Sequence, residues 1–167
     1  MSDEGGIQDN DKGLEKIKQE ILALSKLSVK VGILENAGSV DGVDIAEYAA
    51  ENEYGVPGPP YSENGDGVWF IPPRPFVRGY IDSNLEKIKN IKEMLTAQLI
   101  DGKIDAEAAI DKLGKNTKEG IKHFIKTPSN HTPNAKSTVR RKGTSRPLVD
   151  TGAMRDAVDY EVVRKAK

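Results

Sequence analysis

Ile71-Pro72-Pro73-Arg74-Pro75-Phe76 is the stretch that decides how this chain folds. Each proline ring fixes φ and removes an N–H donor, so three prolines within four positions exclude a helix interior and a paired strand. The longest amphipathic run of the sequence follows directly. We therefore predict a rigid elbow with extended chain before it and a long helix after it. Pro75 suits the first helical position, where a missing N–H costs nothing.

The long helix is predicted over residues 75–100. Its apolar residues recur at steps of three and four and so share one face: Val77, Ile81, Leu85, Ile88, Ile91, Leu95 and Leu99. Phe76 stands at the start of this face and is expected to be buried. A second helix is predicted over 105–126, with Asp105 as its N-cap. Gly114 and Gly120 lie inside it, and each costs about 1 kcal/mol relative to Ala. The middle of this helix is therefore either loose or closely packed.

The chain before the elbow alternates between helical and strand patterns. Apolar residues at helical spacing predict a helix over 11–26, and alternation with period two predicts a half-buried strand over 27–34. A short helix over 43–54 ends at Gly55. A strand over 68–71 leads into the elbow and is expected to pair with the strand over 27–34.

Two polar segments rich in Gly, Pro, Ser, Thr and Asn are predicted to be loops inserted in the domain, 55–67 and 127–147. A last strand is predicted over 157–163, after a helical turn capped by Asp150 or Thr151. These elements predict an α+β fold, with a small, mostly antiparallel β-sheet packed by one long and several shorter helices and a long flexible basic loop.

Length and composition narrow the class of protein. The 167 residues fit a flexible N-terminal tail over 1–10 and a single domain over 11–167. No cysteine is present, which rules out a disulfide scaffold and thiol catalysis. No apolar run approaches the ~20 residues of a membrane span, and the N-terminus lacks the pattern of a secretory signal. We therefore expect a protein made and kept in the cytoplasm, or in something assembled there, without a membrane.

The titratable residues do not form a recognisable reactive group. Several carboxylates have the spacing of solvated helix faces, namely Asp101, Asp105, Glu47, Glu51 and Glu53. The two histidines, His123 and His131, are too few for most zinc sites and are expected on a helix surface and in a loop. There is no nucleophile elbow and no phosphate-binding glycine loop. We predict no catalytic, cofactor-binding or metal site, and a protein that is not an enzyme.

One segment has a distinct charge. Between Gly120 and Val149 there is no acidic residue and there are seven basic ones: Lys122, Lys126, Lys136, Arg140, Arg141, Lys142 and Arg146. Two interpretations stay open, a solvated connector or an interaction surface for phosphates or for an acidic protein. Interleaved aromatic residues for base stacking are absent. Because the segment is polar and like-charged, we expect 128–146 to be mobile in the isolated protein.

Arg74 stands between two prolines, so its backbone is stiff. A guanidinium held in this way suits an ion pair with a carboxylate, either within this chain or on a neighbouring protein. The alternative is that it only covers the end of the long helix.

Two parts of the chain together resemble one family. Ile71-Pro-Pro-Arg-Pro-Phe-Val-Arg78 is similar to the Ile-Pro-x-Arg-Pro-Phe-Leu-Arg signature of tailed-phage virion morphogenesis proteins, the tail-completion or neck proteins of long-tailed phages. The preceding Ile45-Ala-Glu-Tyr-Ala-Ala-Glu-Asn-Glu-Tyr-Gly55 resembles the helix that such proteins carry there. Thr132-Pro-Asn-Ala-Lys-Ser-Thr-Val-Arg-Arg-Lys-Gly143, followed by Arg146-Pro-Leu-Val-Asp-Thr-Gly-Ala-Met-Arg155, resembles the second family segment.

The resemblance covers roughly residues 28–164, in the family's order. This chain departs from it in a Gly/Pro-rich insertion at 56–67 and at Asp156-Ala157, where many relatives have a Ser-Ile-like pair. These departures affect the size of one loop rather than the family.

The resemblance implies a structural role at the phage head–tail junction, in the virion neck. It implies a ring of copies of this chain, a hexamer, in contact with the connector or stopper and with the tail-terminator or tail-tube proteins. DNA in the channel is a further partner that fits the basic segment. The structural motif residues are Pro72, Pro73, Pro75, Pro147, Asp150, Thr151 and Gly152, and the candidate interface residues are Arg74, Phe76, Lys136, Arg140, Arg141, Lys142 and Arg146. The alternative function is a nucleic-acid-binding accessory protein that acts through 122–146.

Overall fold

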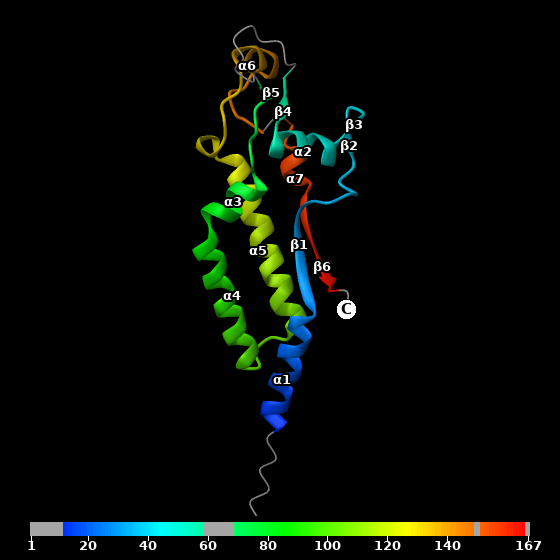
Figure 1. Cartoon of the computed structure of the whole chain (residues 1–167), viewed down its shortest axis with the longest axis vertical. Coiled ribbons are helices and arrows are strands. Elements are labelled where there is room, and N and C mark those ends of the chain that lie inside the picture. The colour runs from blue at the N-terminus through cyan, green and yellow to red at the C-terminus, as the bar shows by residue number, and fades with distance from the viewer. Residues whose placement is uncertain (1–11, 59–68, 149–150, 166–167) are drawn as a thin grey trace, which may run out of the picture.

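Helix α5 (Ala106–Lys126) is the element on which the other parts of the fold are assembled. The computed structural model describes residues 12–58, 69–148 and 151–165. Strands β1 (Leu27–Ile33) and β6 (Val158–Arg164) pair side by side and both lie on α5. Helix α1 (Lys12–Ser25) contacts α5 as well, and the molecule is elongated, with α1 near one end (Figure 1). The fold is α+β, as predicted.

The strand pairing differs from the prediction at the elbow. β1 pairs antiparallel with the C-terminal strand β6, from Leu27 opposite Arg164 to Ile33 opposite Val158. Strand β5 (Trp69–Ile71) pairs instead with β4 (Val56–Pro57), so the predicted pairing of 68–71 with 27–34 is wrong. β5 has only three residues before a proline run without N–H donors. Seven residues of β6 offer a far longer ladder, and both strands can bury one face on α5.

The predicted long helix is two helices. α3 (Val77–Ser83) and α4 (Leu85–Ile100) are separated at Asn84, whose φ of −128° and ψ of 21° are not helical. The Asn84 side-chain amide donates to the Tyr80 carbonyl over 2.8 Å. Asparagine competes for backbone groups in this way and so interrupts helices. Pro75 precedes the N-cap Phe76, so the prediction of one helix that begins at Pro75 is wrong.

Capping residues mark the boundaries of α2 and the start of α5. Helix α2 (Ile45–Tyr54) begins after Asp44, which accepts from the amides of Ala46 and Glu47, and it ends at Gly55 with φ 79°. Asp105 caps α5 by accepting from the Ala108 amide over 2.7 Å. A small hairpin of β2 (Ser39–Val40) and β3 (Val43–Asp44) leads into α2.

The basic segment contains regular structure, so the prediction that 127–147 forms only a loop is wrong. A 3-10 turn η1 (Pro128–Asn130) is followed by helix α6 (Lys136–Lys142) at the end of the molecule opposite α1 (Figure 1). The next helix is α7 (Ala153–Asp156), where the Thr151 hydroxyl accepts from the Ala153 amide over 3.3 Å. Asp150, the N-terminal tail and most of the 55–67 segment lie outside the described residues.

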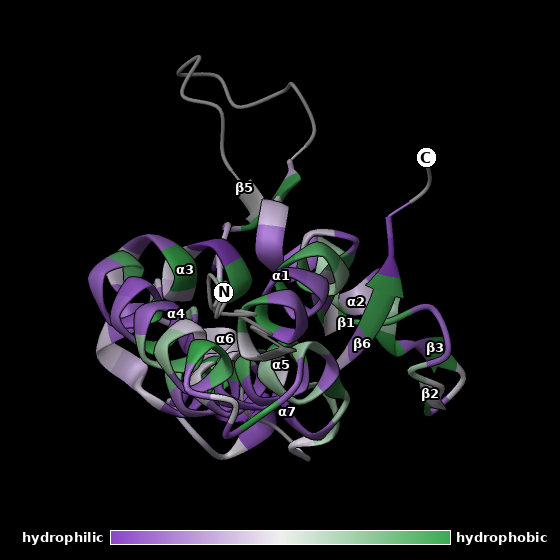
Figure 2. Cartoon of the chain, turned by 90° about the horizontal axis from the view of Figure 1, so that it is seen from below, coloured by the Kyte–Doolittle hydropathy of each residue, from purple (hydrophilic) through white to green (hydrophobic). Residues whose placement is uncertain are grey.

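Two apolar clusters lie along α5. One surrounds Phe76, Tyr80, Ile121 and Val158, and the other joins α1, α4 and β1 to the first half of α5. Figure 2, a view along the long axis, shows β6 beside the helices, with hydrophobic and hydrophilic residues along its length. Among the described residues, no helix is both long and apolar enough to cross a membrane.

The two glycines of α5 mark its closest contacts. A Cβ at Gly114 would overlap the Tyr160 ring on β6, and a Cβ at Gly120 would overlap the Tyr80 phenol on α3. Of the two alternatives left open by the sequence, a loose or a closely packed middle of this helix, the structure shows the closely packed one.

Candidate interface and its support

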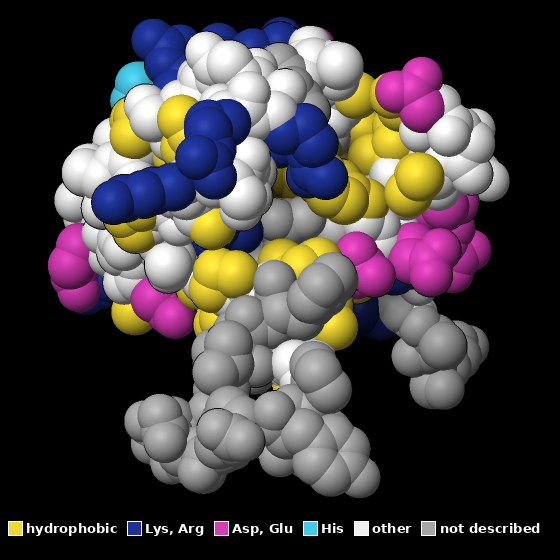
Figure 3. All heavy atoms as spheres, turned by 90° about the horizontal axis from the view of Figure 1, so that it is seen from above, with side chains coloured by type: hydrophobic (Ala, Val, Ile, Leu, Met, Phe, Trp, Pro, Cys, Tyr) yellow, Lys and Arg dark blue, Asp and Glu magenta, His cyan; other side chains and the backbone are white. Residues whose placement is uncertain are grey.

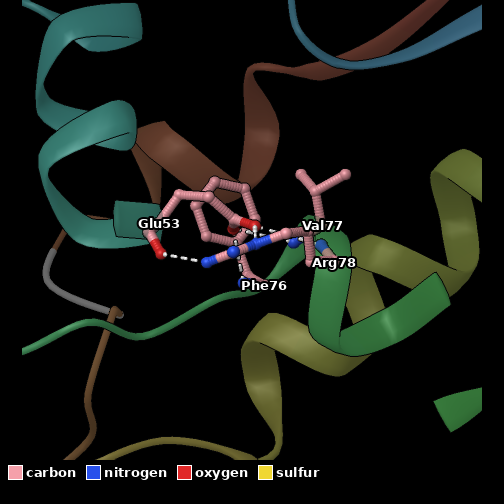
Figure 4. A network of polar contacts seen from close by, with 4 residues as sticks. All are labelled: Glu53, Phe76, Val77 and Arg78. Atoms are coloured by element: carbon pink, nitrogen blue, oxygen red, sulfur yellow. Dashed lines mark hydrogen bonds and ion pairs between the residues drawn. The ribbon is translucent and has the colours of Figure 1, made fainter. Parts of the chain in front are cut away.

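Glu53 connects the end of α2 to the start of α3 (Figure 4). Its Oε2 accepts from the amides of Phe76 over 2.6 Å and Val77 over 3.0 Å. Its Oε1 accepts from the Arg78 amide over 3.1 Å and forms an ion pair with the Arg78 Nε over 3.3 Å. The first amides of a helix lack intrahelical partners and carry partial positive charge, so a carboxylate is well matched to them.

The Glu53 side chain is only 7% exposed, so the interpretation of this residue as part of a solvated face is wrong. The spacing of the glutamates along α2 carries no information about α3. The helix terminus that Glu53 satisfies begins 23 residues later in the chain.

The end of α2 also contacts the elbow through its backbone. The Asn52 carbonyl accepts from the Arg74 amide over 2.7 Å. A Cβ at Gly55 would lie 2.9 Å from Pro73 Cδ, so a glycine is required there for space as well as for its positive φ. These contacts fix the direction in which the proline run leaves β5.

Arg74 holds the start of the basic segment. Its Nε donates to the Thr132 carbonyl over 2.8 Å, and its Nη2 donates to the Pro133 carbonyl over 3.3 Å and to Asn134 Oδ1 over 3.4 Å. The residue is 7% exposed, and burial lowers the pKa of its guanidinium. Among the described residues no carboxylate forms an ion pair with Arg74. An ion pair with a carboxylate of a neighbouring protein stays a prediction.

Two further hydrogen bonds complete this contact. The Thr132 hydroxyl donates to the Pro73 carbonyl over 3.4 Å, and the Asn134 amide donates to the Arg146 carbonyl over 3.1 Å. We use the name elbow junction for the contacts that join residues 52–55, 73–78 and 132–134. It attaches both ends of the α6 segment to the elbow.

His131 is buried beside the elbow junction, at 7% exposure. Its Nε2 lies 3.1 Å from the Phe124 carbonyl, and its ring meets the Phe124 ring edge-on at 5.4 Å between centroids. Its Nδ1 is buried and has no hydrogen-bond partner among the residues that the structure describes. Burial lowers the pKa of His131, and this outweighs the opposing hydrogen bond to Phe124. His131 lies between η1 and α6, outside any helix, as predicted.

The candidate interface residues fall into two groups. Lys136, Arg140, Arg141 and Arg146 are exposed on and after α6, and Lys142 is partly buried. Figure 3 shows lysine and arginine side chains gathered on the face seen from this end of the molecule. Phe76 and Arg74 are 1% and 7% exposed, so as interface residues they are corrected to internal ones. The burial predicted for Phe76 is confirmed.

The other motif residues have structural positions. Pro72, Pro73 and Pro75 lie between β5 and α3, Pro147 is buried after α6, and Gly152 directly precedes α7. Within the described ranges, no three His, Asp or Glu side chains are grouped so as to hold a metal ion.

Comparisons with known proteins give no further identification. No family model matches the chain, and no curated protein or solved structure matches it either.

Proposed function

We propose that this protein is a structural virion component of a tailed bacteriophage. It is a tail-completion or neck protein that forms or completes a ring between the connector and the tail. The observation that carries this proposal is the elbow junction. All three segments that resemble the family meet there, through Glu53, Arg74 and Asn134.

The junction supports a structural role because it joins segments that are far apart in the chain. Arg74 reaches 60 positions along the sequence to Asn134, and Glu53 reaches 23 to Phe76. Buried hydrogen bonds to a charged group are worth about 1.5–3 kcal/mol each. Contacts of this kind hold the exposed basic helix in a defined place, which suits a protein that must meet a neighbour in one orientation.

The two ends of the molecule differ in chemistry, as a connecting piece between unlike neighbours requires. The α6 end carries exposed cations, whereas α1 near the other end exposes Ile21 by 48% and Leu22 by 60%. Exposed apolar groups on a helix suit a protein contact.

The proposal is tested by electron microscopy of negatively stained particles. Purified protein is mixed with tails or with connectors from particles that lack it. We expect a ring on the end of the tails or the connectors, and restored joining of heads to tails. Tails and connectors that remain bare at protein concentrations well above those of the particles would contradict the proposal.

A second function, binding of nucleic acid through 122–146, is favoured by the exposure of Lys136, Arg140, Arg141 and Arg146. It predicts retardation of free double-stranded DNA in a gel at about 0.15 M salt, with affinity that falls steeply as salt rises because counterions are released. Binding of free DNA without any assembly with tails would favour this second function over the first.

A further inference from the structure

A hollow of about 280 Å³ lies next to the basic helix, between the β2–β3 hairpin, α2, α6 and α7. Apolar side chains supply much of its lining, including Val43, Ile45, Leu148 and Met154. Ile45, Leu148 and Met154 belong to the buried core, so this part of the hollow is held rigidly. Val43 is 53% exposed and stands at its entrance. The hollow can therefore receive an apolar side chain from outside without rearrangement of the fold.

The charges around the hollow favour an acidic ligand. Arg141 and Lys142, in the last turn of α6, both line it, and among the described residues Asp41 is the one carboxylate that does so. The rest of the 122–146 segment adds further basic residues and no acidic one. A surface of one sign raises the local concentration of ligands of the other sign.

The combination of charge and apolar lining separates protein from DNA as the occupant. A sugar–phosphate backbone satisfies cations but carries no projecting apolar side chain of leucine size that could fill an apolar hollow. A peptide with an apolar side chain between carboxylates satisfies both. Burial of a Leu-sized side chain contributes about 1.5–3 kcal/mol.

We propose that this hollow binds a segment of a partner protein in which an apolar side chain is flanked by acidic residues. The apolar side chain enters between Ile45 and Met154, and a flanking carboxylate pairs with Arg141. This inference rests on the proposed neck function for the place of the partner, a neighbouring ring protein, but the binding itself belongs to the isolated chain.

The test uses the full chain and three synthetic peptides of seven residues with blocked ends. One has a central leucine between Asp and Glu residues, the second has serine in place of the leucine, and the third has lysines in place of the acidic residues. Methyl NMR of Ile45 and Met154 reports entry into the hollow, and the dependence of the shifts on peptide concentration gives the affinity. We expect the acidic leucine peptide to shift both methyl signals and the other two to bind at least about fivefold more weakly.

Two pairs of variants locate the contact. Arg141→Gln and Arg140→Gln remove the same charge from neighbouring positions, but only Arg141 lines the hollow. We expect Arg141→Gln to weaken the acidic peptide about twofold to fivefold beyond the effect of Arg140→Gln, as for an exposed ion pair. Val43→Asp and Val43→Asn remove the same apolar side chain and have nearly the same shape, but only the first adds a carboxylate, so we expect Val43→Asp to weaken the acidic peptide more than Val43→Asn does. All three sites have exposed side chains, and thermal melts check that each of the four variants is folded.

The inference is overturned if the three peptides bind alike, if millimolar acidic peptide leaves the Ile45 and Met154 methyls unmoved, or if a DNA duplex shifts the same methyl signals as strongly. If any of these results is found while the tails are capped by rings, the neck function is supported and only the proposed binding site is contradicted. If the acidic peptide binds but the tails stay without rings, the binding site is supported and the neck function is contradicted.

Discussion

Glu53 shows how one side chain can hold two helices at a fixed angle. Glu53 lies in the last turn of α2, and its carboxylate accepts from the amides of Phe76, Val77 and Arg78 at the start of α3, over 2.6–3.1 Å. No side chain on α3 itself caps this terminus. The start of α3 therefore depends on a residue from another helix rather than on its own sequence.

We predict that Glu53→Gln lowers the free energy of unfolding by about 1–3 kcal/mol, because buried amides lose a charged acceptor. Glu53→Ala should cost more, since it leaves those amides without any acceptor. Urea unfolding monitored by circular dichroism measures both. Glu47→Gln, at an exposed position of the same helix, is the matched control and should change stability by less than about 0.5 kcal/mol. An equal effect of the two substitutions would show that the carboxylate of Glu53 contributes nothing special.

His131 gives the fold a dependence on pH. Burial lowers the pKa of His131 below its usual 6.5, with Arg74 lowering it further and Glu53 opposing this. The unfolded chain therefore takes up a proton at a pH where the folded protein does not. The contribution of this residue to stability is fully present above about pH 6.5 and declines as the pH falls below that value.

We expect wild-type protein to lose more stability between about pH 7.5 and pH 5 than His131→Gln does, because glutamine does not titrate. Urea titrations at several pH values measure the difference between the two curves, which isolates His131 from the other titrating groups. If the two proteins have parallel pH profiles, His131 is not protected from protonation by the fold.

At the scale of the elements, the surface of α5 decides how closely its neighbours approach. Gly114 admits the Tyr160 ring from β6, and Gly120 admits the Tyr80 phenol from α3. In an isolated helix either glycine would be unfavourable by about 1 kcal/mol relative to alanine. The close packing of the strands and of α3 on α5 offsets that cost.

We predict that Gly120→Ala destabilises the protein by about 1–3 kcal/mol, as overpacking in a core does, although helix propensity alone predicts a gain of about 1 kcal/mol. The double variant with Tyr80→Leu should lose less than the sum of the two single changes, since the shorter side chain removes the overlap. A double-mutant cycle from thermal or urea melts measures the coupling. Additive effects would mean that the contact with Tyr80 is not the cause.

At the scale of the whole molecule, a nearly neutral chain of net charge −1 presents a locally cationic end. Helix α6 places Lys136, Arg140 and Arg141 on its exposed surface, and the elbow junction anchors the segment that carries them. Charges exposed in this way contribute little to folding. They can therefore be changed to test assembly without damage to the fold.

We predict that the triple change Lys136→Gln, Arg140→Gln and Arg141→Gln shifts the melting temperature by less than about 3 °C, because the residues are exposed and glutamine keeps helix propensity. It should nevertheless reduce the fraction of ring-capped tails several-fold. The control removes the same charge from α4, as Lys87→Gln, Lys89→Gln and Lys92→Gln, which are also exposed. If both triple variants cap the tails to the same extent, the α6 surface has no specific role in capping. Either net charge alone matters, or none of these charges does.

Several elements have local signals that predict them from the order of residues alone. Asp105 marks a helix start by its side-chain acceptor, and Gly55 marks a helix end by its positive φ. The helix predicted over 43–54 begins two residues later, because Val43 and Asp44 form β3 and Asp44 caps α2. The alternation in β1 and β6 likewise predicts strands, because burial of one face needs only period two.

Which strands pair, and which side chains contact each other, follows from the tertiary structure and not from local sequence. The choice of β6 over β5 as the partner of β1 depends on ladder length and on the surface of α5, neither of which is visible in β1. The buried positions of Glu53 and Arg74 depend on a helix terminus and on carbonyls that lie up to about 60 residues away. Spacing along one helix reports the face that a residue occupies, but not what packs against that face, and so Glu53 was placed correctly on its helix and wrongly in solvent. Arg74 was placed correctly in the proline elbow, but the carbonyls that it contacts lie 58 and 59 residues away and leave no mark on its local sequence.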